Sequence, residues 1–218
     1  MNFTELYEDM SGKIVAVVSG DYSGTGFFID RRGYIATAEH VVSGKENVEV
    51  ITVFSNPNSI PARVVKRNQK LDIAILKIEH NEDLPTVELG DSSQVKIGDE
   101  IVILGFPFGK SMWGIFLPAI HRGIISNTIQ LVENQAEEKI TKRFQLDVMA
   151  NKGNSGGPLA LNKNGKAIGV LTNVILEKTI GDAILIGGKS ITSPTGIAMA
   201  TPSDYLREMM TSLEFSSN

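Results

Sequence analysis

A dozen short runs rich in β-branched residues follow one another along the chain, and this pattern constrains the fold most. Each run has the length of a strand, and Gly, Pro, Asn or Asp stands at the breaks between runs. Many short strands at regular spacing predict an all-β sandwich or a pair of barrels. The runs are KIVAVVSG, GTGFFID, YIATAEHVV, NVEVITVF, PARVVKRN, DIAILKIE, DEIVILGFP, RGIISN, FQLDVM, GPLALN, KAIGVLTNVIL and TGIAMATP.

The last residues of the chain have a different pattern. In TPSDYLREMMTSLEF the apolar residues recur at helical spacing, which predicts a helix over residues 201–214. Thr201 can cap this helix, and Pro202 suits its first position because no N–H donor is needed there. The strands divide into two groups of roughly equal size, which meet near the polar stretch at residues 89–100. No low-complexity linker separates them, so we expect two halves that pack tightly together.

Composition excludes several classes of function. Hydrophobic residues make up 42% of the 218 residues and charged residues 21%, which is typical of a globular protein. The net charge of −4 indicates no basic patch, so we expect no nucleic-acid partner. The chain has no cysteine, which excludes disulfides, thiolate metal sites and cysteine nucleophiles. The histidines lack metal-ligand spacing and the Asp residues lack a calcium-loop pattern, so we expect no metal and no cofactor.

The first residues, MNFTELYEDMSGK, contain no basic segment followed by an apolar core, so no signal peptide is visible. The longest apolar runs are well short of the about 18 residues that a membrane helix needs. We therefore expect a chain without a membrane span and with a cytoplasmic location.

The stretch GNSGGPLAL, residues 153–161, places Ser155 among three glycines with the spacing Gly-x-Ser-x-Gly. The nucleophile elbow of α/β-hydrolases has this spacing, but it needs a strand–turn–helix context and a histidine that follows the serine. Here His40, His80 and His121 all precede the serine, and the residues after it are typical of a strand. The elbow interpretation therefore fails on both order and context.

A second hydrolase design has the order His, Asp, Ser on β-barrels. A serine hydroxyl is a weak nucleophile, so it needs an imidazole to take its proton and an acid to orient that imidazole. His40, Asp72 and Ser155 follow this order. Each alone has an ordinary interpretation, as a core histidine, a turn aspartate or a turn serine, but together they predict a catalytic triad. For His121 we favour a surface role over catalysis.

The chain contains, in this order, the motifs GTGFFID, YIATAEHVV, DIAILKI, GDEIVILGFPFG and QLDVMANKGNSGGPLA. Together they resemble a chymotrypsin-fold serine protease of the HtrA/Deg type, from about Lys13 to the terminal helix. The resemblance implies an all-β fold of two six-stranded antiparallel β-barrels with a C-terminal α-helix. It implies one peptidase domain over residues 1–218, with barrels over about residues 12–92 and 93–200. The active site would lie in the cleft between the barrels.

The resemblance also implies a role for each residue near the serine. Ser155 would attack the peptide carbonyl, His40 would carry the proton and Asp72 would orient the histidine, as in a serine endopeptidase acting on polypeptides. The backbone N–H groups of Gly153 and Ser155, with Asn154 between them, would form the oxyanion hole. Asn154 carries no charge for an ion pair with a freed N-terminus, so we expect no activation by N-terminal cleavage.

A substrate pocket follows from the same resemblance. Met149, upstream of the nucleophile, would line its base. An apolar base disfavours Lys and Arg because an unpaired buried ammonium is costly, so we expect a preference for small or medium apolar side chains. The strand with Leu171, Thr172 and Asn173 would form one wall, and Ile197 would lie in the far wall.

The resemblance leaves other functions open. The same triad fits a latent or pseudo-protease that uses the fold only for binding, and it fits a processing protease with one narrow partner. Two long irregular stretches, residues 108–120 and 176–196, are of the kind that is often functional or mobile. No residues remain after the terminal helix for a PDZ-like domain, so we expect a protease domain without one.

HtrA-type relatives often form trimers, so a homo-oligomer is an expectation by resemblance. Phe3, Leu6 and Tyr7 have the spacing of one helical face, which could dock on a neighbouring copy or cap the barrel of its own chain.

Next to the predicted base, Glu39 could raise the pKa of His40 or point into solvent.

Overall fold

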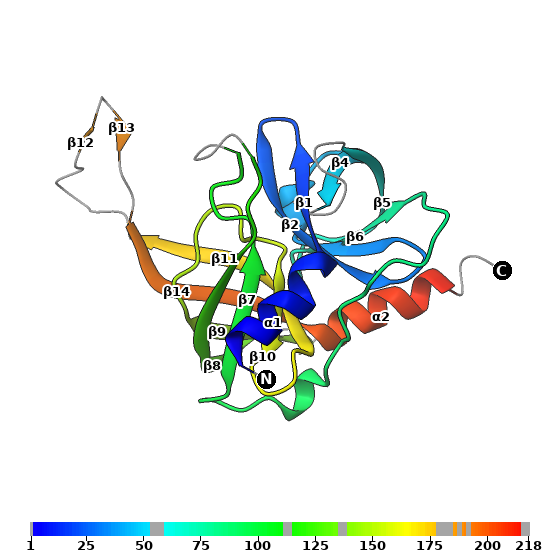
Figure 1. Ribbon diagram of the computed structural model, residues 1–218. Coiled ribbons are helices and arrows are strands. Elements are labelled where there is room, and N and C mark those ends of the chain that lie inside the picture. Colours follow the sequence, from blue (N-terminus) through cyan, green and yellow to red (C-terminus); the bar gives the residue numbers. More distant parts are fainter. Residues whose placement is uncertain are drawn as a thin grey trace.

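Two closed antiparallel β-barrels lie side by side in the computed structural model (Figure 1). The structure describes residues 2–52, 59–110, 115–134, 139–177, 185–186, 189–190 and 193–214. Strand order is β1-β2-β3-β6-β5-β4 in the first barrel and β10-β11-β14-β9-β8-β7 in the second. The predicted all-β fold with two six-stranded barrels and a C-terminal helix is therefore confirmed.

The elements follow the predicted runs. The first barrel contains β1 (Ile14–Ser19), β2 (Tyr22–Asp30), β3 (Tyr34–Thr37), β4 (Asn47–Thr52), β5 (Ile60–Asn68) and β6 (Ile73–Ile78). The second barrel contains β7 (Glu100–Gly105), β8 (Ala119–Asn134), β9 (Lys139–Asp147), β10 (Pro158–Leu161), β11 (Ala167–Glu177) and β14 (Ser193–Pro202). A separate hairpin pairs β12 (Leu185–Ile186) with β13 (Lys189–Ser190). The helices are α1 (Phe3–Met10), α2 (Ser203–Glu214) and three short 3₁₀ segments, η1 (Ser11–Lys13), η2 (Glu39–Val41) and η3 (Ser92–Gln94).

Strand β1 is buried on both of its faces, and this explains its nearly continuous apolar sequence. Side chains alternate along a strand, so Val15 and Val17 fill the first barrel while Ile14 and Ala16 face the second. Strand β7 does the same from the other side: its odd residues Ile101 and Ile103 fill the second barrel, and its even residues join the cluster between the barrels. The side chains of β1 and β7 that point out of their own barrels therefore pack together between the barrels, beside the site.

Helix α2 joins the two barrels. It begins at Ser203, two residues after the predicted start, because β14 continues to Pro202. The predicted cap was wrong: the Thr201 hydroxyl does not cap the helix but donates to the carbonyl of Leu71 in the first barrel. Leu206 packs into the cluster between the barrels, and Lys66 Nζ of β5 donates to the carbonyl of Met209 at 3.4 Å.

Helix α1 packs against the hydrophobic core of its own chain. Asn2 and Glu5 form a capping box at its start, which satisfies two backbone N–H groups. Leu6 is fully buried, and Tyr7 donates to the carbonyl of Pro118 at 3.5 Å. The apolar face that was expected either to dock on a neighbour or to cap the barrel is therefore covered within the chain, in front of the second barrel in Figure 1.

None of the helices among the described residues is long and apolar enough to cross a membrane. The two long irregular stretches are described only in part, because residues 111–114 of one and residues 178–184, 187–188 and 191–192 of the other lie outside the described ranges.

Candidate active site

The side chains of His40 and Asp72 form a hydrogen-bonded pair at one end of the first barrel. His40 lies in η2 just after β3, and Asp72 immediately precedes β6. The two strands are antiparallel partners, Thr37 with Ala74, so the residues that follow one strand meet those that precede the other. His40 Nδ1 lies 2.8 Å from Asp72 Oδ2, and the backbone N–H of His40 donates to Oδ1 at 2.9 Å. Because an ionised carboxylate only accepts, the neutral form of His40 carries its proton on Nδ1 and keeps a lone pair on Nε2.

The turn that carries Asp72 is held from the second barrel. Asp72 has a φ of 52°, in the left-handed region that Asp tolerates better than most residues. Two neighbouring carbonyls are bonded across the interface: Thr201 Oγ1 donates to Leu71, and Arg143 Nη2 donates to Lys70, both at 2.6 Å. Both donor residues are buried. The position of the carboxylate therefore depends on both barrels.

The surroundings of the imidazole raise the pKa of His40 above the ordinary value of 6.5. The largest cause is the hydrogen bond to Asp72. Burial opposes it, and the negative charges of Asp72 and Glu39 support it. The side chain of Glu39 is only 7% exposed, with its Oε1 3.5 Å from Arg67 Nη1. Glu39 therefore does not point into solvent. Of the two possibilities that the sequence left open, the structure supports the one in which Glu39 raises the pKa of His40.

Ser155 lies in a tight turn between β9 and β10 that glycine makes possible. Gly153 and Gly156 have φ values of 96° and 88°. A Cβ on Gly153 would lie 2.2 Å from the carbonyl oxygen of Phe106, and one on Gly156 would lie 2.0 Å from that of Thr25. Backbone this close on both sides admits no side chain, so the packing requires glycine at positions 153 and 156.

The Ser155 turn and the His40 segment meet at Gly24 on β2. A Cβ on Gly24 would lie 2.6 Å from Val41 Cγ2 and 2.9 Å from the carbonyl oxygen of Ser155. The N–H of Thr25 also donates to that carbonyl at 2.8 Å. In the described part of the chain no hydrogen bond joins Ser155 Oγ to His40, a contact that is often long without substrate. The structure thus brings the segments of the three predicted residues together.

Two backbone N–H groups of the turn, those of Gly153 and Ser155, have no acceptor among the described residues. The carbonyl of Lys152 accepts a backbone N–H from the loop after β7 at 2.6 Å, and that of Asn154 accepts from Gly157 at 3.0 Å. In a trans peptide the N–H points opposite to the carbonyl, so both unbonded N–H groups point away from these partners. Two fixed donors on either side of one residue can receive a negatively charged oxygen.

Asn154, between these donors, has a wholly buried side chain. Its Nδ2 lies 3.3 Å from Nε2 of His121 on β8. Burial lowers the pKa of His121 below 6.5, so its ring is neutral near neutral pH. His121, for which we expected a surface role rather than catalysis, is half-buried and contacts Asn154. No pattern in the sequence pairs the two residues, because the contact depends on where β8 lies beside β7.

Two of the predicted pocket residues expose apolar side chains. Met149 is 57% exposed and Ile197 is 39% exposed. The N–H of Val148 donates to the carbonyl of Gly196 at 2.9 Å, which holds the two segments next to each other. Asn173, on β11, is also exposed. The contribution of these three side chains to substrate binding stays a prediction.

Leu171 and Thr172 are buried, so their side chains are turned away from solvent. Leu171 packs in the core of the second barrel, and Thr172 Oγ1 donates to the carbonyl of Met199 at 3.2 Å. The backbone of Leu171 holds the nucleophile turn: its carbonyl accepts from Gly156 at 2.7 Å, and its N–H donates to Gly157 at 2.9 Å. Any contact of these two residues with a substrate would therefore be through their backbone.

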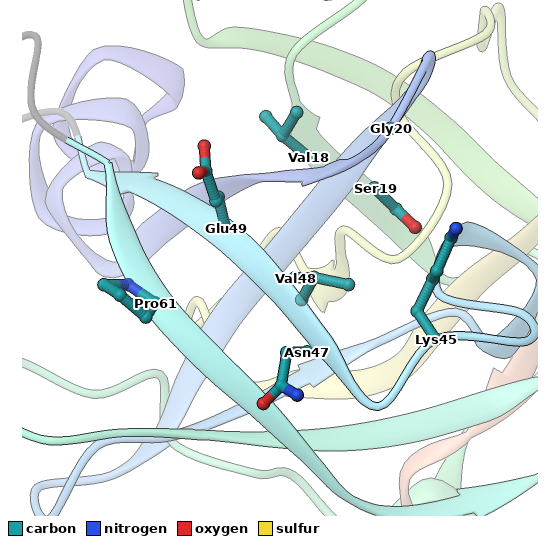
Figure 2. A pocket seen from close by; sticks show the side chains of 8 residues that line it. All are labelled: Val18, Ser19, Gly20, Lys45, Asn47, Val48, Glu49 and Pro61. Atoms are coloured by element: carbon teal, nitrogen blue, oxygen red, sulfur yellow. The ribbon is translucent and has the colours of Figure 1, made fainter.

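A pocket of about 530 Å³ opens on the first barrel (Figure 2). It contains none of the residues discussed above, and its walls come from the β1–β2 turn, β4 and the start of β5. Its lining residues are Val18, Ser19, Gly20, Lys45, Asn47, Val48, Glu49 and Pro61. Over the described ranges, no three His, Cys, Asp or Glu side chains are grouped so that they could hold a metal ion.

Comparison with known proteins agrees with the two-barrel fold. The family model described as "Trypsin-like peptidase domain" matches residues 24–170. Three similar proteins share the name "Probable periplasmic serine endoprotease DegP-like". One from Hahella chejuensis is 32% identical over 192 residues, which is 88% of this chain and 35% of the relative. One from Pseudomonas fulva is 36% identical over 151 residues, 69% of this chain and 29% of the relative. One from Rickettsia conorii is 34% identical over 165 residues, 75% of this chain and 30% of the relative.

The names of these relatives overturn one expectation. All three are called periplasmic, which contradicts the cytoplasmic location expected from the first residues of the sequence. The chain spans only about a third of the length of these relatives, between 29% and 35%. The first residues of this sequence are therefore no guide to whether a leader precedes them, and that is why the expectation failed.

Proposed function

Because the chain belongs to the trypsin-like peptidase family, we propose that it is a serine endopeptidase that cleaves polypeptides. The observation that carries this proposal is the double hydrogen bond by which Asp72 holds His40, at 2.8 and 2.9 Å, beside the turn of Ser155. The names of the relatives support an endoprotease, and they also favour a periplasmic location. We further propose that residues 1–218 form one peptidase domain.

In the proposed mechanism, Ser155 Oγ attacks the carbonyl carbon of the scissile peptide while His40 Nε2 takes the hydroxyl proton. Asp72 stabilises the charged imidazole and keeps its proton on Nδ1. The C–N bond then breaks, and His40 gives the proton to the leaving amine, which leaves an ester on Ser155. Water, activated by the same imidazole, attacks this acyl-enzyme and releases the second product.

The negative charge on the carbonyl oxygen is received by the N–H groups of Gly153 and Ser155. Their lack of a partner in the described structure supports this role, because a fixed donor without an acceptor needs no reorganisation to bind an oxyanion. Loss of one such donor typically costs about 2.7–4 kcal/mol in the barrier.

For the substrate we propose a small or medium apolar side chain before the scissile bond. The exposed apolar side chains of Met149 and Ile197 support this, since neither offers a partner to an ammonium or guanidinium group. Asn173 would bind the substrate backbone from the edge of β11. Oligomerisation, with the trimer of HtrA-type relatives as the expected state, is a separate proposal that light scattering of the purified protein tests.

The test is digestion of a denatured protein such as casein, with the new termini identified by mass spectrometry. We expect cleavage after small and medium apolar residues by the wild type and none by Ser155→Ala. Cleavage after Lys or Arg would contradict the proposed pocket but not the proposed endopeptidase activity. A folded wild type that cleaves nothing would favour the latent or pseudo-protease alternative.

A further inference from the structure

The side chain of Asn154 lies at a decisive point in the proposed oxyanion hole. It is wholly buried, and Asn154 lies between Gly153 and Ser155, the two residues whose N–H groups are unbonded among the described residues. Its Oδ1 faces β7 so closely that a Cβ on Gly105 would lie 2.8 Å away. The amide therefore fills its site, and a change in its orientation would move the peptides on both sides of it.

Within the described structure, the amide of Asn154 has one side-chain partner. Its Nδ2 lies 3.3 Å from His121 Nε2, while its Oδ1 is buried without a hydrogen bond. A buried polar group with no partner destabilises its position, so the bond to His121 is the polar contact that favours the observed orientation.

His121 is placed to accept this bond. It lies on β8 opposite Ile103 of β7, so its backbone is fixed in the barrel ladder. Its ring is half-buried, and burial lowers its pKa and favours the neutral form. A neutral imidazole with its proton on Nδ1 presents a lone pair at Nε2, which is what the N–H of an amide requires.

We propose that His121 is a positioning residue for catalysis: it holds the side chain of Asn154 and thereby keeps the N–H groups of Gly153 and Ser155 aimed at the oxyanion. This inference rests on the proposed endopeptidase function. Among the described residues no hydrogen bond joins His121 to Ser155 or His40, so we expect it to act through Asn154. Because Asn154 carries no charge, it cannot form an ion pair with a freed N-terminus. Its contact with His121 takes the place of such an ion pair.

The test compares His121→Ala with His121→Gln, whose side-chain oxygen can accept the same bond. For cleavage of a fluorogenic peptide we expect His121→Ala to lower kcat by about 10- to 100-fold with KM nearly unchanged, because donors to the oxyanion act in the transition state. His121→Gln should recover part of the loss. His80→Ala is the matched control, since His80 is exposed in a turn and its ring contacts only Glu82 among the described residues.

A readout that does not depend on activity separates this inference from the proposed function. In NMR spectra the side-chain amide of Asn154, assigned by its loss in Asn154→Asp, should exchange slowly in the wild type and fast in His121→Ala. Unchanged exchange, or an equal kcat in wild type and His121→Ala, would overturn the role of His121. A wild type that cleaves nothing while its amide exchange responds to His121→Ala would overturn the proposed function and leave the contact established.

Discussion

Thr201 of the second barrel donates a 2.6 Å hydrogen bond from its Oγ1 to the carbonyl of Leu71 in the first barrel, one residue before Asp72. Thr201 is 0% exposed. Together with the bond from Arg143 to Lys70, it fixes the turn that presents the carboxylate. The barrel that carries the nucleophile turn therefore also holds the acid that orients the base. Such a link makes the proposed site sensitive to the packing between the barrels.

Replacing Thr201 by Val keeps the shape of the side chain and removes the donor. The carbonyl of Leu71 then loses its buried partner, so we expect a loss of about 1–3 kcal/mol in the free energy of unfolding. We also expect a lower kcat, because the Asp72 turn is less firmly held. Urea unfolding and peptide cleavage measure the two effects. Thr211→Val is the matched control, since among the described residues that exposed hydroxyl bonds only within α2, to Arg207. Equal losses in the two variants would contradict the prediction.

Gly156→Ala should damage the nucleophile turn severely. The new methyl group would lie 2.0 Å from the carbonyl oxygen of Thr25, at a φ that L residues rarely adopt. We expect a loss of more than about 3 kcal/mol in the free energy of unfolding, measured by urea titration. Gly44→Ala, with a φ of 70° and no atom within 4 Å, separates the two causes. It should lose only the backbone contribution of about 1–2 kcal/mol. Similar losses at both positions would mean that the close packing at Gly156 has no effect.

Activity should fall as pH decreases, with a midpoint above 6.5, because His40 must be neutral to act as a base and its pKa is raised by Asp72 and Glu39. The raised pKa of His40 stabilises the folded state at low pH, where activity is lowest. Its contribution is fully present below the unfolded value of 6.5 and is lost as pH rises through the folded value.

The variant Glu39→Gln tests the electrostatic origin of this shift. It removes one negative charge beside His40, so the midpoint of kcat/KM against pH should move to lower pH. Glu79→Gln is the control, since that side chain is 94% exposed and does not affect His40. A midpoint that stays in place in Glu39→Gln, or moves equally in the control, would contradict the assignment.

Asp72→Asn should keep the fold and lose most of the activity. An amide can donate to Nδ1 and so favour the wrong tautomer of His40, and related triads lose about 10⁴-fold in kcat by this change. We expect a similar loss with little change in KM. The control Asp83→Asn alters an exposed carboxylate on the first barrel and should leave kcat unchanged. A kcat within tenfold of wild type in Asp72→Asn would argue against its proposed role.

Much of the fold could be predicted from the sequence. The β-branched runs matched the strands of both barrels because strand length, alternation and glycine breaks are local signals. The resemblance to HtrA/Deg-type proteases is confirmed by the family match and the DegP-like relatives. The start of α2 was misplaced by two residues because β14 continues to Pro202, and the predicted cap failed because Thr201 bonds to Leu71, far away in the sequence.

The candidate site was predictable in its residue types but not in its supports. The order of His40, Asp72 and Ser155 was visible, whereas the contacts that position them were not. The bond between Asn154 and His121 depends on which strand lies beside the nucleophile turn. The burial of Leu171 likewise follows from the register of β11 with its neighbours. Register and strand order are tertiary properties, so no local pattern reports them.

The proposed mechanism requires Ser155 to be an activated nucleophile beside two open oxyanion donors. The most direct test is treatment of the protein with a fluorophosphonate probe, followed by intact mass and peptide mapping. We expect one adduct on the wild type, located on Ser155, and none on Ser155→Ala. Equal labelling of both proteins would show that another residue is the nucleophile, and a folded wild type without any adduct would contradict an assembled site.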